Sequence, residues 1–462
     1  MFILCLLVLA TGLCVGGASL PGMPGDFVVQ VVSIPLALAV LAGRLRGRTP
    51  RLSRGEILLL LLGPAVAVAQ LVPLPPAVWE LLPRADLRLA PFDALGMAPD
   101  WRPASLDVEA TGLALMSLLP PTVFFIGIRM LKRSERRALL LAAIALLTVG
   151  VFLGLAQLAG GPASPLRFYA MTNPSEAVGF FANRNHFAAS LYVGVLFAAP
   201  FLIESGVGFL AARRKREVGA EHLVVLMGAA TLTLLFCAAV VMTRSRAGAA
   251  LALAAVVGIG VLLVLRPHNR WRRTSIVLFA GLFAGVGLFA AQAGLGRMLD
   301  RLASDTGVDG RFAITRNTLA AAEDFFPFGS GLGSFPKVYA LYEESADLIP
   351  RAYVNAAHDD WLQLLLETGA VALVVAALVL AWVIGRGVDL FRRPDLGGGH
   401  LDLSVRRSAF LAVILLAVHS TVDYPLRTAA GMMLFALAAG LTGTRRHRSR
   451  DAAAAEPEVL PP

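Results

Sequence analysis

Residues 138–158 read ALLLAAIALLTVGVFLGLAQL, an apolar block without a single charged side chain. An α-helix rises about 1.5 Å per residue, so a block of this length covers the roughly 30 Å hydrocarbon layer of a bilayer. Four basic residues, Lys132, Arg133, Arg136 and Arg137, come just before the block. The stretch predicts a transmembrane helix with a basic loop at its start.

Apolar blocks of this kind recur along the whole chain. The protein has 462 residues, of which 57% are hydrophobic and only 16% are charged, with a mean hydropathy of +0.72. Soluble domains carry about 25% charged residues, so an ordinary water-soluble protein is excluded. We expect an all-α polytopic membrane protein with about twelve transmembrane helices, at residues 2–20, 27–42, 56–73, 108–128, 138–158, 183–203, 223–243, 247–265, 274–294, 361–385, 408–424 and 428–443.

Basic residues are gathered in one set of alternate loops, with clusters at residues 44–48, 213–216 and 270–273. The positive-inside rule places these loops, and both chain termini, in the cytoplasm. The same loops account for the formal net charge of +10 without a nucleic-acid partner. The three cysteines lie inside apolar blocks and are odd in number, which argues against a disulfide framework.

Two long loops are expected on the outer, periplasmic side. Residues 74–107 are rich in proline and hold Trp79 and Trp101, which we expect at the membrane interface. Residues 295–360 hold most of the polar chemistry. We therefore divide the chain into residues 1–294 with nine spans, the long outer loop at 295–360 between the ninth and tenth spans, residues 361–443 with three spans, and a cytoplasmic tail at 444–462 that we expect to be disordered.

Arginines at two outer helix junctions are the first candidates for a functional site. Arg184 and Asn185 lie in FFANRNHFA, where the sixth span begins, and Arg244 and Arg246 lie in the short turn TRSRAG. Snorkelling to lipid phosphates explains a single arginine at such a place. Three of them at two junctions suit a diphosphate better, because guanidinium groups bind phosphate oxygens through two hydrogen bonds at once.

The long outer loop adds a second set of candidates. Arg311 and Arg316 open a helical stretch, and a glycine-rich turn, PFGSGLGSF, follows at residues 327–335. Such a turn permits close backbone approach to a ligand, but an ordinary turn between helices explains it as well, since no strand precedes it. Tyr339 and Tyr342 suit either stacking on sugar rings or anchoring at the interface.

His358 is the sharpest catalytic candidate. It lies in NAAHDDWLQ, residues 355–363, which runs into the tenth span. Asn355 is a candidate N-cap, and Asp359 complements the helix dipole. The positive end of a helix keeps an imidazole neutral, so that it can accept a proton from a hydroxyl. A purely structural histidine at a helix start is the alternative.

A metal site built from His358, Asp359 and Asp360, with His186 or Asp423, is the competing interpretation. Adjacent residues of a helix point about 100° apart and chelate one ion poorly. We therefore expect neither a metal nor another cofactor. Asp423, at the outer end of the eleventh span, is expected to line the same cavity as His358.

These motifs together resemble the O-antigen ligase and O-antigen polymerase-like superfamily of bacterial membrane glycosyltransferases. The resemblance covers residues 27–441 and rests on FFANRNHFA, SRAG, Gly310-Arg311, PFGSGLG, and His358 followed eleven residues later by Gly369. It implies a GT-C-type helical fold, a site at the periplasmic face of the bacterial inner membrane, and an inverting, metal-independent reaction. The donor would be a glycan on undecaprenyl pyrophosphate, and the acceptor a glycan or a lipid of the lipid A-core type.

The resemblance also implies roles for individual residues. The positions matching Arg246 and Arg311 are linked to the pyrophosphate, and the position matching His358 to catalysis. Around them we expect Arg184, Arg244, Arg316, Asn185, Asp359 and Asp423. Asp359 and Ala370-Val371 depart from the residues found in ligases that use lipid A core, which leaves a capsule or exopolysaccharide polymerase open.

A transporter or a lipid-linked glycan flippase is the alternative from another class. Twelve spans with both ends inside suit a secondary carrier. Carriers, however, place charged sites near the bilayer midplane, often on broken helices in repeated halves. Here the ionisable residues gather at the outer ends of the expected spans, and no repeat is evident.

Overall fold

The computed structural model describes residues 1–47, 50, 52–266, 280–281, 307–345, 353–392 and 398–443. Within these residues the chain is helical almost throughout. A single small sheet among them pairs β1 (Pro73–Leu74) with β2 (Arg102–Pro103) in antiparallel register. The all-α class predicted from the apolar blocks is confirmed.

Eight helices in the described part of the chain are long and apolar enough to cross a membrane. They are α2 (Pro24–Leu45), α3 (Arg54–Leu71), α6 (Val108–Ser117) with α7 (Leu119–Met130), α8 (Arg133–Ala159), α9 (Arg184–Lys215), α10 (Ala220–Met242), α11 (Arg246–Val264) and α17 (Ala370–Phe391). Two further apolar helices, α1 (Phe2–Val15) and α19 (Ala429–Leu441), are shorter. The multi-pass class is thus supported, but not the number of twelve spans. The expected ninth span, 274–294, lies outside the described residues except for 280–281.

The expected span at 361–385 is not one helix. It consists of α16 (Asp360–Thr368) and α17, which are separated by Gly369 with a φ of 57°. A right-handed helix cannot continue through this backbone conformation, which only glycine adopts without cost. A Cβ at Gly369 would also lie 2.0 Å from the carbonyl oxygen of Pro327, so contact with a distant turn imposes the break.

The expected span at 408–424 has the wrong bounds. Helix α18 runs from Gly399 to His419, so it begins before Arg406 and Arg407, the basic pair that precedes the expected span. Arg407 is buried there and donates hydrogen bonds to the carbonyl oxygens of Leu390 and Leu265, at 2.9–3.1 Å. Because its charge is satisfied inside the protein, the arginine does not mark the end of the helix.

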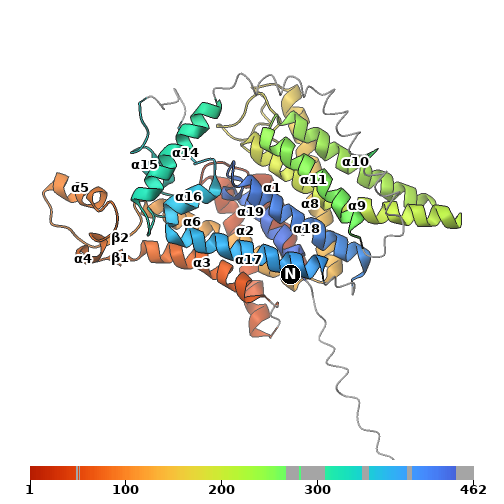
Figure 1. Ribbon diagram of the computed structural model, residues 1–462, viewed down its shortest axis with the longest axis horizontal. Coiled ribbons are helices and arrows are strands. Elements are labelled where there is room, and N and C mark those ends of the chain that lie inside the picture. The colour runs from red at the N-terminus through yellow and green to blue at the C-terminus, as the bar shows by residue number, and fades with distance from the viewer. Residues whose placement is uncertain are drawn as a thin grey trace, which may run out of the picture.

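Helix α9 forms the centre of the bundle. It packs against α10, α11 and α18, and every residue from Asn185 to Pro200 is buried. A helix that is apolar on all sides belongs in a core. A second group, in which α1, α2, α7 and α19 pack on one another, adjoins it (Figure 1).

The long loop folds into a small unit at one end of the bundle. Helices α14 (Gly307–Asp324), α15 (Phe335–Tyr339) and α16 enclose a separate apolar core, which includes Phe325, Phe335 and Leu366 (Figure 1). We call this end of the bundle the α14–α16 end. The unit presents the start of α16, and therefore His358, to the adjoining membrane helices.

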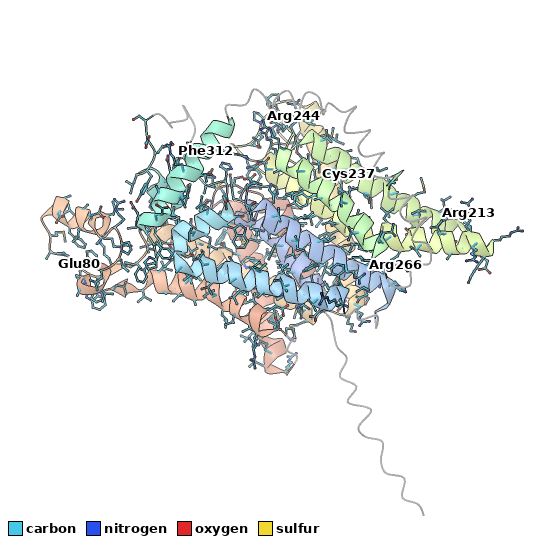
Figure 2. All side chains as sticks on the ribbon, viewed as in Figure 1. Glu80, Arg213, Cys237, Arg244, Arg266 and Phe312 are labelled. Atoms are coloured by element: carbon cyan, nitrogen blue, oxygen red, sulfur yellow. The ribbon has the colours of Figure 1, made fainter. Side chains whose placement is uncertain are left out.

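Residues 76–101 form an arm that projects beyond this end. The arm carries α4 (Pro76–Trp79) and α5 (Asp86–Leu95), and Figure 2 shows Glu80 on it far from Arg213. Trp79, which we expected at the membrane interface, is fully buried instead. Its ring stacks on Phe92 at 6.3 Å between centroids, and its Nε1 donates to the carbonyl oxygen of Asp100.

Candidate functional site

His358 lies just before α16 in a left-handed backbone conformation, with a φ of 53°. Such a conformation costs a non-glycine residue about 1–3 kcal/mol and persists only where the surrounding structure imposes it. The N-cap of α16 is Asp359, whose carboxylate accepts hydrogen bonds from the amides of Trp361 and Leu362, both at 2.9 Å. Asn355 is therefore not the cap, because the helix begins five residues after it.

The imidazole of His358 faces a buried carboxylate. Its Nδ1 lies 3.3 Å from Oδ1 of Asp423, which is fully buried, whereas the His358 side chain is 26% exposed. Burial alone would raise the pKa of Asp423, but the hydrogen bond from His358 and the nearby imidazoles of His186 and His419 hold it well below the usual range. An ionised carboxylate only accepts hydrogen bonds, so Nδ1 of His358 carries a proton. In the neutral ring, Nε2 is then the acceptor.

Aromatic contacts support the pair formed by His358 and Asp423. The ring of Tyr424 meets the rings of His358 and His186 edge to face, with centroids 5.1 and 4.7 Å away. Nδ1 of His419 lies 3.1 Å from the hydroxyl of Tyr192. His186 and His419 are both buried. Of these three histidines, only His358 has a side chain that a substrate can reach.

Two of the expected arginines converge on an acidic residue that sequence reasoning missed. Nη1 of Arg184 lies 3.0 Å from Oε1 of Glu176, and Nη1 of Arg244 lies 4.0 Å from the same oxygen. Arg184 is the first residue of α9, where Asn183 is the N-cap and accepts from the amide of Asn185. Arg244 has a φ of 52° in the turn before α11. The start of α9 and the turn before α11 thus bring two guanidinium groups to one buried carboxylate.

The other candidate arginines lie on different elements. Arg246 begins α11 and is half-buried. Arg311 is exposed on α14. Arg316 turns toward its own loop, where its Nε donates to Asn317 at 3.2 Å and its Nη2 lies 3.9 Å from Glu344. Arg246 and Arg311 thus stand on α11 and α14, and Arg316 contacts residues of its own part of the chain.

The glycine-rich turn serves packing between protein segments. Gly329, Gly331 and Gly333 all have positive φ. A Cβ at Gly329 would lie 2.5 Å from the backbone of Glu367, and one at Gly333 would lie 2.9 Å from the carbonyl oxygen of Ala110, so the close backbone approach that these glycines permit is to α16 and α6. This favours the ordinary turn between helices over a phosphate-binding loop.

A second polar cluster lies on the other side of α16, and sequence reasoning missed it as well. Arg427, in the short helix η1 (Pro425–Arg427), places its guanidinium between Asp360, at 3.2 Å, and Glu367, at 3.2 Å. Asp360 and Glu367 are seven residues apart and therefore share one face of a helix. A carboxylate inside the apolar run WLQLLLETG was the available signal in the sequence.

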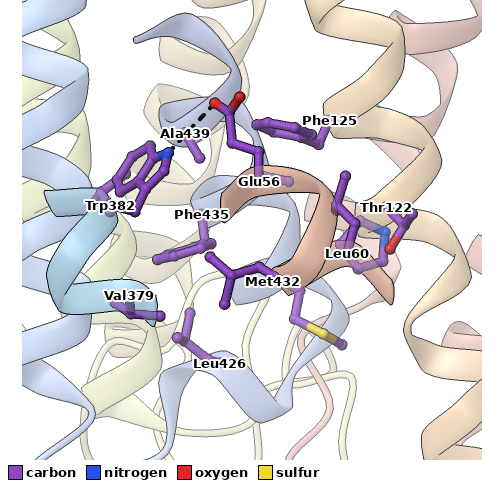
Figure 3. Close-up of a pocket in the computed structure, with 14 residues that line it drawn as sticks. Glu56, Leu60, Thr122, Phe125, Val379, Trp382, Leu426, Met432, Phe435 and Ala439 are labelled. Atoms are coloured by element: carbon purple, nitrogen blue, oxygen red, sulfur yellow. Dashed lines mark hydrogen bonds between the residues drawn. The ribbon is translucent and has the colours of Figure 1, made fainter. Parts of the chain in front are cut away.

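Two adjoining cavities lie beside this cluster. The outer cavity has a volume of about 450 Å³, and Asn355, Tyr424 and the three residues of the polar cluster line it. The inner cavity, of about 330 Å³, is lined mainly by apolar side chains and ends at Glu56, which accepts a hydrogen bond from Trp382 (Figure 3). The two cavities share the lining residues Leu59, Val379, Leu426, Met432 and Phe435. Together they form one amphiphilic space, which is polar at Asn355, Asp360 and Arg427 and apolar in its depth; His358 and Asp423 are not among its lining residues.

The metal interpretation gains nothing from this geometry. Among the residues that the structure describes, no group of three or more histidine, cysteine or acidic side chains is arranged to hold a metal ion. The one contact between His358 and Asp423 occupies Nδ1 of the imidazole. The arrangement is that of a histidine with a carboxylate partner.

A helical membrane bundle with a histidine–carboxylate pair and arginines at its helix ends defines a multi-pass membrane protein with an enzyme-like site. Residues 231–377 match the sequence model of a family described as O-antigen ligase, which confirms the resemblance to the O-antigen ligase-like superfamily. The match supports a membrane glycosyltransferase-like function with a lipid-linked glycan substrate. No curated protein matches the chain. The matched range includes Arg244, Arg246, Arg311, Arg316 and His358, but not Arg184 or Asp423.

Proposed function

We propose that this protein is an inner-membrane glycosyltransferase that moves a glycan from undecaprenyl pyrophosphate onto a glycan or lipid acceptor at the periplasmic face. The observation that carries the proposal is the contact between His358 and the buried Asp423. It gives the imidazole a tautomer whose Nε2 can take a proton from a hydroxyl. The family match supplies the lipid-linked glycan as substrate class.

Arginines bind the pyrophosphate of the donor in this proposal. Arg246 and Arg311 are the principal ligands. Arg184 and Arg244, which lie beside the carboxylate of Glu176, assist them. Arg244 has a half-exposed side chain, 52% accessible, so it can exchange its 4.0 Å contact with Glu176 for a phosphate oxygen. Glu176 keeps the two guanidinium groups in place before the donor arrives.

The reaction is a single displacement at the anomeric carbon. The acceptor oxygen forms a bond to C1 of the donor sugar while its proton passes to Nε2 of His358. The bond from C1 to the pyrophosphate oxygen breaks, and its electron pair leaves with undecaprenyl pyrophosphate. Attack from the opposite face inverts the anomeric centre. No metal and no nucleotide is required, because arginines neutralise the leaving group.

Two contributions to catalysis are expected, the stabilisation of charge on the leaving pyrophosphate and the transfer of the acceptor proton. A preorganised donor to developing charge contributes about 10²–10³-fold, and several arginines act together on the pyrophosphate. A positioned general base contributes about 10²–10⁴-fold. The amphiphilic space formed by the two cavities suits the lipid chain of a substrate, because its apolar part lies among α3, α7, α17 and α19.

Transfer by the purified protein in detergent tests the proposal. With a labelled lipid-linked donor, His358→Ala should lose most transfer activity while donor binding persists, because the arginines hold the pyrophosphate. His358→Gln is the matched variant, since an amide can bind the acceptor hydroxyl but cannot take its proton. Full activity in His358→Ala would remove the catalytic role.

The same assay separates the alternatives. A flippase or carrier has nothing to transport in detergent, so product formation there excludes a purely transporting protein. A chelator should leave the rate unchanged, and strict dependence on a divalent ion would instead favour the metal site. Product analysis shows whether single glycan units are joined to one another, as by a polymerase, or attached to a different lipid, as by a ligase.

A further inference from the structure

Backbone amides one residue before His358 and two residues after it donate hydrogen bonds to other segments. Before it, the amide of Ala357 donates to Oε1 of Gln363 at 3.0 Å. After it, the amide of Asp360 donates to the carbonyl oxygen of Ser420 at 2.8 Å. These two bonds enclose the left-handed conformation of His358, which the residue would not adopt on its own.

The residues that form these two hydrogen bonds are connected to Arg427 by further polar contacts. Nε2 of Gln363 donates to Oε1 of Glu367 at 2.9 Å, and Glu367 accepts from Nη1 and Nη2 of Arg427, each at 3.2 Å. Nε of the same guanidinium lies 3.2 Å from Oδ1 of Asp360. Glu367 is fully buried, and Arg427 is its ion-pair partner. One side chain therefore contacts the supports on both sides of His358.

The segment that carries Arg427 also carries the partner of the histidine. Residues 420–427 hold Asp423, and Ser420 and Leu426 in the same segment donate to Oδ2 of Asp360, at 2.8 and 3.4 Å. If this segment moves relative to α16, the 3.3 Å contact between His358 and Asp423 changes with it.

We propose that Arg427, acting through Glu367 and Gln363, is a positioning residue that holds His358 against Asp423. The inference rests on the proposed function, in which His358 is the base. A guanidinium suits the task because its planar fork meets Glu367 while its Nε meets Asp360, and an ammonium cannot make both contacts. Among the residues that the structure describes, no hydrogen bond or ion pair joins the cluster to Arg184 or Arg244, so we expect the cluster to act on the position of His358 rather than on the pyrophosphate.

We call Arg427, Glu367 and Gln363 the clamp. Glu367→Gln is the variant that tests it, and Glu204→Gln is the matched control. Glu204 also accepts a two-point contact from an arginine, Arg266 at 2.8–3.2 Å, and a bond from a second side chain, Ser404 at 2.6 Å. Figure 2 shows Arg266 far from the α14–α16 end. Both substitutions remove one charge from a paired carboxylate and keep its shape.

We expect Glu367→Gln to lower kcat about 10- to 100-fold, since a displacement of about 1 Å at a reacting group costs up to about 100-fold. The affinity for inorganic pyrophosphate, which the arginines bind, should stay unchanged. Glu204→Gln should lower the melting temperature in detergent without lowering kcat. Wild-type kcat in Glu367→Gln, or an equal loss of kcat in both variants, would overturn the clamp.

A readout that needs no transfer activity completes the test. Diethylpyrocarbonate modifies accessible imidazoles, and mass spectrometry measures its rate at His358. The rate should change in Glu367→Gln and stay at the wild-type value in Glu204→Gln, and an unchanged rate in both would contradict the proposal. If Glu367→Gln does not accumulate, Gln363→Met removes the bonds of this side chain to Ala357 and to Glu367 and carries the same expectation. Loss of activity in His358→Ala with a silent clamp variant would refute the clamp alone, whereas activity in His358→Ala would refute the proposed function.

Discussion

Replacing Asp423 by asparagine separates the charge of this carboxylate from its shape. Asp423 is fully buried, and its Oδ1 accepts from the amide of Tyr424 at 3.0 Å and lies 3.3 Å from Nδ1 of His358. Asparagine keeps a carbonyl oxygen for the Tyr424 amide but offers the imidazole a neutral group. The positive charge that the imidazole gains during transfer then lacks its counter-charge.

The geometry sets the size of the effect. The loss cannot exceed the contribution of the base itself, about 10²–10⁴-fold, which corresponds to about 2.7–5.4 kcal/mol at 1.36 kcal/mol per factor of ten. In a buried Ser-His-Asp triad the same substitution costs about 10⁴-fold. The distance of 3.3 Å exceeds the roughly 2.7–2.9 Å of a strong charge-assisted bond, and His358 is 26% exposed. We therefore expect a loss near the lower bound, about 10²-fold.

Single-turnover transfer with saturating labelled donor measures this loss directly. Asp359→Asn is the control, because Asp359 caps α16 without contacting the imidazole, and asparagine is as good an N-cap as aspartate. The reasoning is refuted if Asp423→Asn transfers glycan at the wild-type rate, or if Asp359→Asn loses as much activity as Asp423→Asn.

Three further predictions concern topology, the donor site and stability. A cysteine at the exposed Glu344 should react with a membrane-impermeant thiol reagent in cells whose outer membrane alone is permeabilised, and labelling only after the inner membrane is broken would reverse the topology. Arg246→Ala and Arg311→Ala should each lower transfer at least about 10²-fold while the protein accumulates normally, with lysine only partly replacing arginine; full activity in both alanine variants would remove the pyrophosphate site. Because the folded-state pKa of Asp423 lies below its unfolded value, Asp423 stabilises the fold above about pH 4, and this contribution is lost as the pH falls through the folded pKa. The melting temperatures of wild type and Asp423→Asn should therefore differ most near neutral pH and converge below about pH 4, and a gap that stays constant into strong acid would contradict this assignment.

The sequence predicted those helices whose ends coincide with a change in polarity. The blocks at 223–243 and 247–265 correspond to α10 and α11 within a few residues, because charged or polar residues flank both. Gly369 gave no such signal, since a lone glycine is tolerated inside a transmembrane helix. Its positive φ comes from the contact with Pro327, forty-two residues away, and no local pattern encodes that contact.

The candidate site divides in the same way. Arg184, Arg244 and His358 stand in local motifs at helix ends, where residue type and position alone suggested chemistry. The residues that contact them do not stand in such motifs. Asp423 is 65 residues from His358, and Arg427 is 60 residues from Glu367. Such partners come together only when η1 packs on α16. The end of an expected span suggested Asp423 as a neighbour of His358, but nothing in the sequence indicated which arginine pairs with Glu367.

The break at Gly369 separates two mechanical roles that a continuous helix would join. Within the described part of the chain, helix α17 is the least buried of the eight candidate spans, with only 6% of its apolar window buried. Such a helix tilts when bilayer thickness changes. Were it continuous with α16, each tilt would act as a lever on His358. With the joint at Gly369, α17 can pivot while α16 stays fastened to α14 and η1. The same site geometry is then available in membranes of different thickness.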